Sequence, residues 1–141
     1  MHTRIARLLL VPAALGILFA QNPSNLKVVP IKPTQAASGQ QMFNTYCAAC
    51  HGKEGMGDGP VTAALKKAPA DLTSLSKRNN GKFPELDVYH SILGDGRIAA
   101  HGSQDMPVWG DVLKSLDGDS NRMVKLRISN LLDYVKSLQK K

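Results

Sequence analysis

The amino-acid sequence predicts an all-α fold, and two observations support this prediction. Apolar residues recur at helical spacing over residues 38–50 and again over residues 121–139. No stretch shows the alternation of apolar and polar residues that is typical of a half-buried strand, and no internal repeat is present. The length of 141 residues suits one folded domain with an N-terminal extension.

Local signals place the helices along the chain. Ser38, followed three residues later by Gln41, predicts a capping box at the start of a helix that ends at about Cys50. Pro84 is expected in the first turn of a helix that ends at Leu93. Further helices are expected over 108–116 and 121–139, with at most a short helix over 61–67 and irregular chain over 69–81. The predicted inward faces are Gly39, Met42, Phe43, Tyr46 and Cys50; Leu86, Val88, Tyr89, Ile92 and Leu93; and Val124, Ile128, Leu131, Leu132, Val135 and Leu138.

Residues 1–20 have the pattern of an export signal. Arg4 and Arg7 precede an apolar run over residues 8–20, which is shorter than the roughly 20 residues that cross a bilayer. Cleavage after this run is expected, and its retention as a membrane anchor is the alternative. Residues 21–37 contain three prolines and are predicted to form a tether, and residues 38–141 to form the folded domain.

Both cysteines of the chain lie in one short run, Cys47-Ala48-Ala49-Cys50-His51. A C-x-x-C-H run is typical of a c-type haem attachment site. Cysteines three residues apart project from one face of a helical turn, so both thiols can bond to the same haem. The adjacent histidine is then placed to bind the iron. We therefore expect one haem c per chain, attached through Cys47 and Cys50, with His51 as an iron ligand.

Two other interpretations of the cysteine pair remain open. A thioredoxin-like redox couple needs a βαβ context, and the flanking sequence offers no strand pattern. A zinc site usually needs further cysteine or histidine residues at ligand spacing, and no second such pair exists.

A glycine-rich loop follows the motif, with glycines at 55, 57 and 59. A phosphate-binding loop would need a lysine followed by serine or threonine after the glycines, and none follows. We expect instead that the loop wraps closely around a flat cofactor, where side chains would clash. Metal-bound histidines usually give their second ring N–H to a carbonyl or carboxylate, and the Pro60 carbonyl is the predicted acceptor for His51.

A second iron ligand is expected in the loop over residues 97–110. Met106 is the candidate, because Pro107 stiffens the backbone beside it and glycines at 102 and 110 permit tight turns. Thioether sulfur opposite imidazole raises the reduction potential of haem iron. Trp109 is expected to pack on the haem or under the last helix, with a hydrogen bond to a haem propionate as the alternative.

Other side chains compete with Met106. Met56 lies only five residues after His51, and an extended chain of that length reaches ~17 Å, barely enough to round the macrocycle. The remaining alternatives are His101 and His90 as ligands, or an open coordination site. The sequence places Met42 and Met123 on helices, where core positions are expected.

The order of these features resembles the class I c-type cytochromes. These are small monohaem proteins with an early C-x-x-C-H, a later methionine before a proline, and a C-terminal helix that crosses the first helix. The resemblance implies a cytochrome c-like fold of four or five helices around one covalently attached haem. It also implies His51 and Met106 as axial ligands, and a close contact of Gly39 and Phe43 with Tyr134. It covers about residues 38–139 and depends on Gly39–Phe43, CAACHGKEGMGDGP (47–60), PADL (69–72), ILGDGR (92–97), DMPVWG (105–110) and LLDYVKSL (131–138).

The expected function is single-electron transfer by an exported, periplasmic cytochrome that is not an enzyme. The net charge is +7, and since two of the positive charges lie in the leader, the rest of the chain carries about +5. This charge favours redox partners with acidic surfaces. Nucleic acid is not expected as a partner, because no basic face with interleaved aromatic residues is present. Six basic residues are candidates for a ring around the exposed haem edge that binds such partners, and the alternative is that they are only solvated. They are Lys53, Lys66, Lys67, Lys77, Arg78 and Lys82.

Two alternative functions use the same cofactor. In the first alternative, the protein is a cytochrome c subunit of a membrane-bound oxidase or dehydrogenase and is held at the membrane if residues 8–20 are retained. In the second, it is a haem enzyme whose distal ligand leaves, and Gln104 and Asp105 are the nearby candidates for polar residues of the distal pocket.

Overall fold

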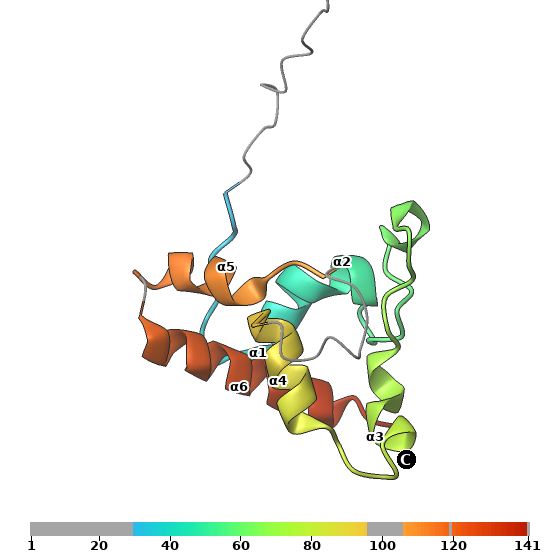
Figure 1. Cartoon of the computed structure of the whole chain (residues 1–141). Coiled ribbons are helices and arrows are strands. Elements are labelled where there is room, and N and C mark those ends of the chain that lie inside the picture. Colours follow the sequence, from blue (N-terminus) through green and yellow to red (C-terminus); the bar gives the residue numbers. More distant parts are fainter. Residues whose placement is uncertain (1–29, 96–105, 119, 141) are drawn as a thin grey trace, which may run out of the picture. The chain divides into compact units, whose positions relative to one another are not determined.

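The computed structural model describes residues 30–95, 106–118 and 120–140, and the chain from Ile31 onward forms one compact unit. Every regular element in the described ranges is helical and none is a strand, which confirms the predicted all-α class (Figure 1). In chain order the elements are α1 (Gly39–Met42), η1 (Phe43–Cys47), α2 (Ala48–His51), η2 (Thr62–Ala64), η3 (Leu72–Ser74), α3 (Leu75–Arg78), α4 (Glu85–Leu93), α5 (Trp109–Leu116) and α6 (Asn121–Ser137).

Elements α1, η1 and α2 follow one another without a break and carry the chain into the C-x-x-C-H motif. Ser38 begins this helical stretch as predicted, since its Oγ accepts a hydrogen bond from the Gln41 N–H at 3.2 Å. The reciprocal half of the predicted capping box is wrong. The Ser38 N–H donates to the Gln35 carbonyl at 3.1 Å, so the Gln41 side chain accepts instead from the Gln35 N–H at 3.0 Å. The π-helical turn η1 in the middle of the stretch is not predicted by the sequence spacing.

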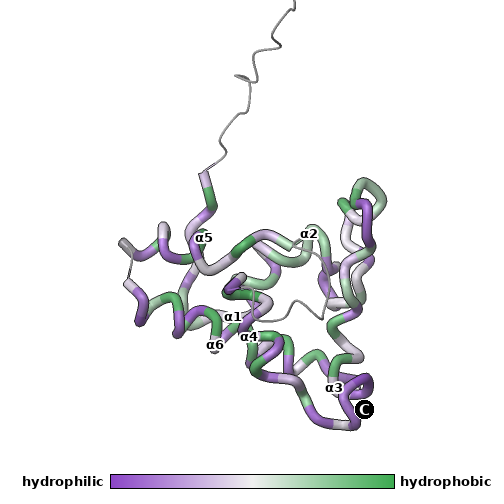
Figure 2. The backbone as a smooth tube through the Cα atoms, in the orientation of Figure 1, coloured by the Kyte–Doolittle hydropathy of each residue, from purple (hydrophilic) through white to green (hydrophobic). Residues whose placement is uncertain are grey.

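The core forms where α1 meets α6, and α4 and α5 also pack against α6 (Figure 1). Hydrophobic and hydrophilic positions alternate along α6, as expected for a helix with one buried face (Figure 2). The rings of Phe43 and Tyr134 lie 5.2 Å apart with an interplanar angle of 52°, so the predicted contact is confirmed. The buried apolar residues of this core are Met42, Phe43, Ala48, Ile92, Leu113, Val124, Ile128, Leu131 and Val135.

Gly39 allows the closest approach between the two helices. A Cβ atom added at Gly39 would lie 1.9 Å from the backbone oxygen of Asn130 and 3.0 Å from Cβ of Tyr134. A backbone oxygen in the middle of α6 cannot move without displacing the helix. The crossing therefore requires glycine at this position.

We expect Gly39→Ala to lower the free energy of unfolding by ~3 kcal/mol, because an overpacked core has to shift to accept the methyl group. The better helix propensity of alanine offsets only about 1 kcal/mol of this cost. Chemical denaturation followed by circular dichroism measures the effect, with Gln40→Ala on the exposed side of α1 as the matched control. A Gly39→Ala protein as stable as the unmutated one would contradict the close crossing.

The helix predicted from Pro84 to Leu93 is largely confirmed by α4, but the predicted burial of one residue is wrong. Pro84 precedes the helix as its N-cap, and the chain leaves it at Gly94 in the left-handed conformation. Leu86, predicted to face inward, is 74% exposed. The first turn of α4 meets α6 through an ion pair between Glu85 and Lys136, so the apolar contacts of α4 begin only after Leu86.

The segment over residues 69–81, predicted to be irregular, contains two short helical elements, η3 and α3. Asp71 caps the first of them, because its Oδ1 accepts hydrogen bonds from the N–H (2.8 Å) and Oγ1 (2.6 Å) of Thr73. These bonds lower the pKa of the Asp71 carboxyl, with the Thr73 hydroxyl as the main cause. An aspartate placed before Thr73 and Ser74 is a typical start signal for a helical turn, so this element was open to prediction.

Candidate haem-binding site

The C-x-x-C-H motif lies at the end of the first helical stretch. Cys47 ends the π-helical turn, and Cys50 and His51 belong to α2. Both cysteines are half-buried free thiols. Burial, together with the nearby Cys50, raises the pKa of the Cys47 thiol to about 12. The reactive cysteine of a thioredoxin-like couple shows the opposite shift, so this environment does not suit that interpretation.

The zinc interpretation also lacks support in the part of the chain that the structure describes. No group of three or more histidine, cysteine, aspartate or glutamate side chains lies close enough together there to hold a metal ion. A structural zinc site needs four such ligands. The motif itself supplies two thiols and one imidazole.

His51 is held by a hydrogen bond from its Nδ1 to the Ala70 carbonyl, at 3.1 Å. A carbonyl oxygen can only accept, so Nδ1 carries the proton and Nε2 keeps its lone pair. Burial lowers the pKa of His51, and the hydrogen bond to Ala70 opposes this shift in part. The result is a neutral imidazole with a fixed tautomer, which is the state of a metal-binding histidine.

The predicted acceptor for His51, the Pro60 carbonyl, is wrong. The glycine-rich loop folds back on the helix, where its N–H groups satisfy the carbonyls that end α2. Gly57 N–H donates to the His51 carbonyl at 2.8 Å, and Gly59 N–H donates to the Cys50 carbonyl at 3.1 Å. The segment that begins at residue 69 supplies the carbonyl for the His51 ring instead.

Packing within the protein explains why position 57 of this loop is a glycine. A Cβ atom at Gly57 would lie 2.5 Å from the Pro69 carbonyl oxygen, and the φ of Gly57 is +82°. The loop is thus packed against the backbone of the segment that contains Ala70. This close packing brings the Ala70 carbonyl within reach of His51.

Met106 lies just before α5 and is half-buried against the hydrophobic core. Trp109, the first residue of α5, packs against Tyr46, with ring centroids 5.5 Å apart and an interplanar angle of 31°. Tyr46 directly precedes Cys47, so the segment that carries Met106 lies close to the helix of the motif. Trp109 is also partly buried against the hydrophobic core. Its packing on the haem or under the last helix stays a prediction.

The alternatives to Met106 occupy other environments. Met42 is fully buried in the core, and Met123 is half-buried on α6. Met56 is 43% exposed, and its sulfur lies 3.6 Å from Nζ of Lys140. Nδ1 of His90 lies 2.7 Å from an Asp95 carboxylate oxygen. His101, Gln104 and Asp105 lie outside the described residues.

The residues present fit a covalently attached haem. Two free thiols stand on one helical turn, and the adjacent histidine has a free Nε2. Half-buried apolar side chains that a macrocycle could cover pack around the core beside them, among them Tyr46, Leu72, Val88, Leu93, Met106 and Trp109. This donor set and the all-helical fold define a c-type cytochrome domain.

A family model described as "Cytochrome C oxidase, cbb3-type, subunit III" matches residues 34–119, which is more than half of the chain. The chain belongs to this family, and its domain is a class I c-type cytochrome domain, as the resemblance implied. No curated protein and no solved structure matches the chain. A cytochrome c domain is an electron-transfer module that holds haem.

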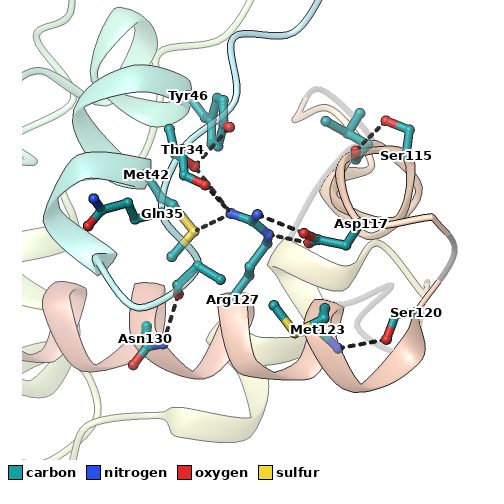
Figure 3. A network of polar contacts seen from close by, with 12 residues as sticks. Thr34, Gln35, Met42, Tyr46, Ser115, Asp117, Ser120, Met123, Arg127 and Asn130 are labelled. Atoms are coloured by element: carbon teal, nitrogen blue, oxygen red, sulfur yellow. Dashed lines mark hydrogen bonds and ion pairs between the residues drawn. The ribbon is translucent and has the colours of Figure 1, made fainter.

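The sequence reasoning missed a buried arginine next to this site. Arg127 is 4% exposed and donates from Nε and Nη2 to the Asp117 carboxylate, at 2.5 and 3.1 Å (Figure 3). Its Nη1 donates to the Thr34 carbonyl at 3.0 Å. A signal was available: Arg127 lies three residues after Val124 and four before Leu131, which places it on the buried face of α6.

The arginine is part of a network that fastens residues 32–36 to the domain (Figure 3). The Tyr46 hydroxyl donates to the Lys32 carbonyl at 2.8 Å, and Asn130 Nδ2 donates to the Ala36 carbonyl at 2.9 Å. The last residues of the proline-containing arm thus contact both η1 and α6. The family match also begins inside this arm, at residue 34.

Proposed function

We propose that the protein is an exported monohaem c-type cytochrome that transfers single electrons between redox partners. In this proposal Cys47 and Cys50 would attach the haem, and His51 and Met106 would bind its iron. The observation that carries the proposal is the His51 ring, whose Nδ1–H is fixed by the Ala70 carbonyl beside two free thiols.

The bound haem would supply the iron that gains and loses the electron. The residues of this chain orient the ligands and keep water out. The hydrogen bond from Nδ1 holds the imidazole plane and makes Nε2 a stronger donor. The packing of Trp109 on Tyr46 fixes the start of α5, and with it the backbone that bears Met106. Ligands held in this way move little when the charge of the iron changes.

A second candidate function is that of a cytochrome c subunit in a membrane-bound oxidase. The observation that favours it is the family match, because the family is named for a subunit of a cbb3-type cytochrome c oxidase. The proposed leader or anchor over residues 1–20 lies outside the described residues. In the ranges that the structure does describe, no helix is long and apolar enough to cross a membrane.

Partner contact is proposed for the exposed basic residues near the motif. Lys53, Lys66 and Lys67 are exposed. Arg78 is partly engaged within the domain, since its guanidinium donates to the Ser74 hydroxyl and, at 2.8 Å, to the Asp71 carbonyl. An acidic redox partner would be attracted to the free lysines, and the attraction would weaken with salt.

The optical spectrum of the purified protein tests the proposed function. We expect haem that stays with the polypeptide in acid and organic solvent, and a long-wavelength methionine–iron charge-transfer band in the native oxidised state. Retained haem without this band would favour His101 or an open site over Met106. Protein without haem, made in a host that can attach it, would contradict the proposal. The mass of the native protein then shows whether residues 1–20 are removed.

A further inference from the structure

The residues that follow α6 are bonded to the segment that carries the Ala70 carbonyl. Gln139 uses both ends of its side-chain amide. Its Oε1 accepts from the Ser76 N–H at 2.9 Å, and its Nε2 donates to the Leu72 carbonyl at 2.7 Å. The backbone N–H of Lys140 donates to the Thr73 carbonyl at 2.9 Å. Figure 1 shows the C-terminus beside α3. We call Gln139 and Lys140 the C-terminal clamp, and residues 70–76 the clamped segment.

The clamped segment is rigid in itself. Asp71 caps η3 through Thr73, as described above, and Thr73 is only 2% exposed. A rigid turn still needs attachments to the rest of the domain to hold its position. One attachment is the hydrogen bond from the Leu72 N–H to the Gly55 carbonyl, at 2.7 Å. Leu72 and Leu75 also pack against the hydrophobic core. The C-terminal clamp adds hydrogen bonds that connect the turn to the end of α6.

We propose that Gln139 is a positioning residue for His51. By holding Leu72, it keeps the Ala70 carbonyl, two residues earlier, at hydrogen-bond distance from His51 Nδ1. This inference rests on the proposed function, in which His51 binds the haem iron. Gln139 and Lys140 lie beyond residues 34–119, which the family model matches.

The clamp has a consequence for the reduction potential. Donation from Nδ1–H to a carbonyl makes the imidazole a stronger electron donor, which stabilises the oxidised iron. Loosening of the Ala70 carbonyl weakens this donation. The residues that follow α6 therefore lower the reduction potential relative to a protein without the clamp, although they are remote from His51 in the sequence.

The test compares three variants of the haem-loaded protein. Gln139→Ala removes all three hydrogen bonds of the side-chain amide, which join it to Ser76, Leu72 and Val135. Gln139→Glu keeps an acceptor for Ser76 and loses the donor to the Leu72 and Val135 carbonyls. Ser137→Ala is the matched control, because the Ser137 hydroxyl donates only to the carbonyl of Tyr134 within α6. The measurements are the hydrogen exchange of the His51 Nδ1–H by NMR in the reduced state, and the reduction potential by spectroelectrochemical titration.

We expect Gln139→Ala to retain haem, to exchange the His51 proton roughly tenfold faster through the loss of net hydrogen bonding, and to have a higher reduction potential. Gln139→Glu should lie between this variant and the unmutated protein, and Ser137→Ala should match the unmutated protein. A Gln139→Ala protein with an altered unfolding free energy but the same exchange rate and potential would overturn the inference and leave the proposed function intact. Lack of haem in the unmutated protein would overturn the proposed function itself.

Discussion

Met106→Ala should leave the haem covalently attached, abolish the long-wavelength charge-transfer band and lower the reduction potential. In the proposed function attachment depends on Cys47 and Cys50, which the substitution does not touch. The band depends on a bond between methionine sulfur and iron, which alanine cannot form. Thioether sulfur favours the reduced iron, so its removal favours the oxidised state. Axial ligands change haem potentials over a range of about 0.8 V, so the shift should be among the largest that any single substitution in this chain produces.

Met56→Ala is the matched control for this experiment. Met56 is 43% exposed and its sulfur contacts Lys140 at the surface, so its replacement should change neither the band nor the potential. Loss of the band in Met56→Ala would assign the ligand to Met56 instead. An unchanged potential in Met106→Ala would contradict the assignment of Met106.

Faster binding of cyanide by the Met106→Ala protein provides an independent measurement. Removal of the distal ligand leaves a position at which a small anion can bind. The unmutated protein should bind cyanide slowly, because the Met106 sulfur has to be displaced first. Fast binding by the unmutated protein would favour the alternative of a haem enzyme with a labile distal ligand.

Much of the fold was predictable because its signals are local. The spacing of Val124, Ile128, Leu131 and Val135 predicts the buried face of α6, and these four residues are buried. The helical spacing of apolar residues over 38–50 likewise predicts the helical stretch that carries Cys47. These patterns depend only on neighbours within two turns of a helix, and the sequence displays them directly.

Contacts between distant segments were less predictable. The acceptor of the His51 proton, Ala70, lies 19 residues after His51. No local pattern distinguishes its carbonyl from that of Pro60, since every residue has a backbone carbonyl. The exposed Leu86 is a second example. Helical spacing predicts which face of α4 is buried, but it does not predict how far along that face the neighbouring helix extends. Contacts of this kind are decided by the packing of whole segments.

Substitution of the buried Arg127 is expected to have a large effect on stability. We expect Arg127→Ala to lower the free energy of unfolding at neutral pH by ~3 kcal/mol, because it removes the buried guanidinium with its hydrogen bonds and leaves the partly buried Asp117 carboxylate without its charged partner. It also leaves the Thr34 carbonyl without its donor. Lys136→Ala, on the same helix, is the control. Lys136 and Glu85 form an exposed pair, with side chains 51% and 52% exposed, and surface pairs contribute little.

The pH dependence of stability separates the charge of the Arg127–Asp117 pair from its packing. Hydrogen bonds from Arg127, and then its charge, lower the pKa of the Asp117 carboxyl below the ordinary value of 3.8. A carboxyl group with a lowered pKa in the folded state stabilises the protein above its unfolded pKa and loses this contribution as the pH falls through the folded value. The stability difference between the unmutated protein and Asp117→Asn should therefore be constant near neutral pH and shrink below about pH 4. Denaturation midpoints measured from pH 7 to pH 2.5 check this. A difference that persists unchanged at the lowest pH would show that Asp117 stabilises the fold through its shape and neutral hydrogen bonds, and not through its charge.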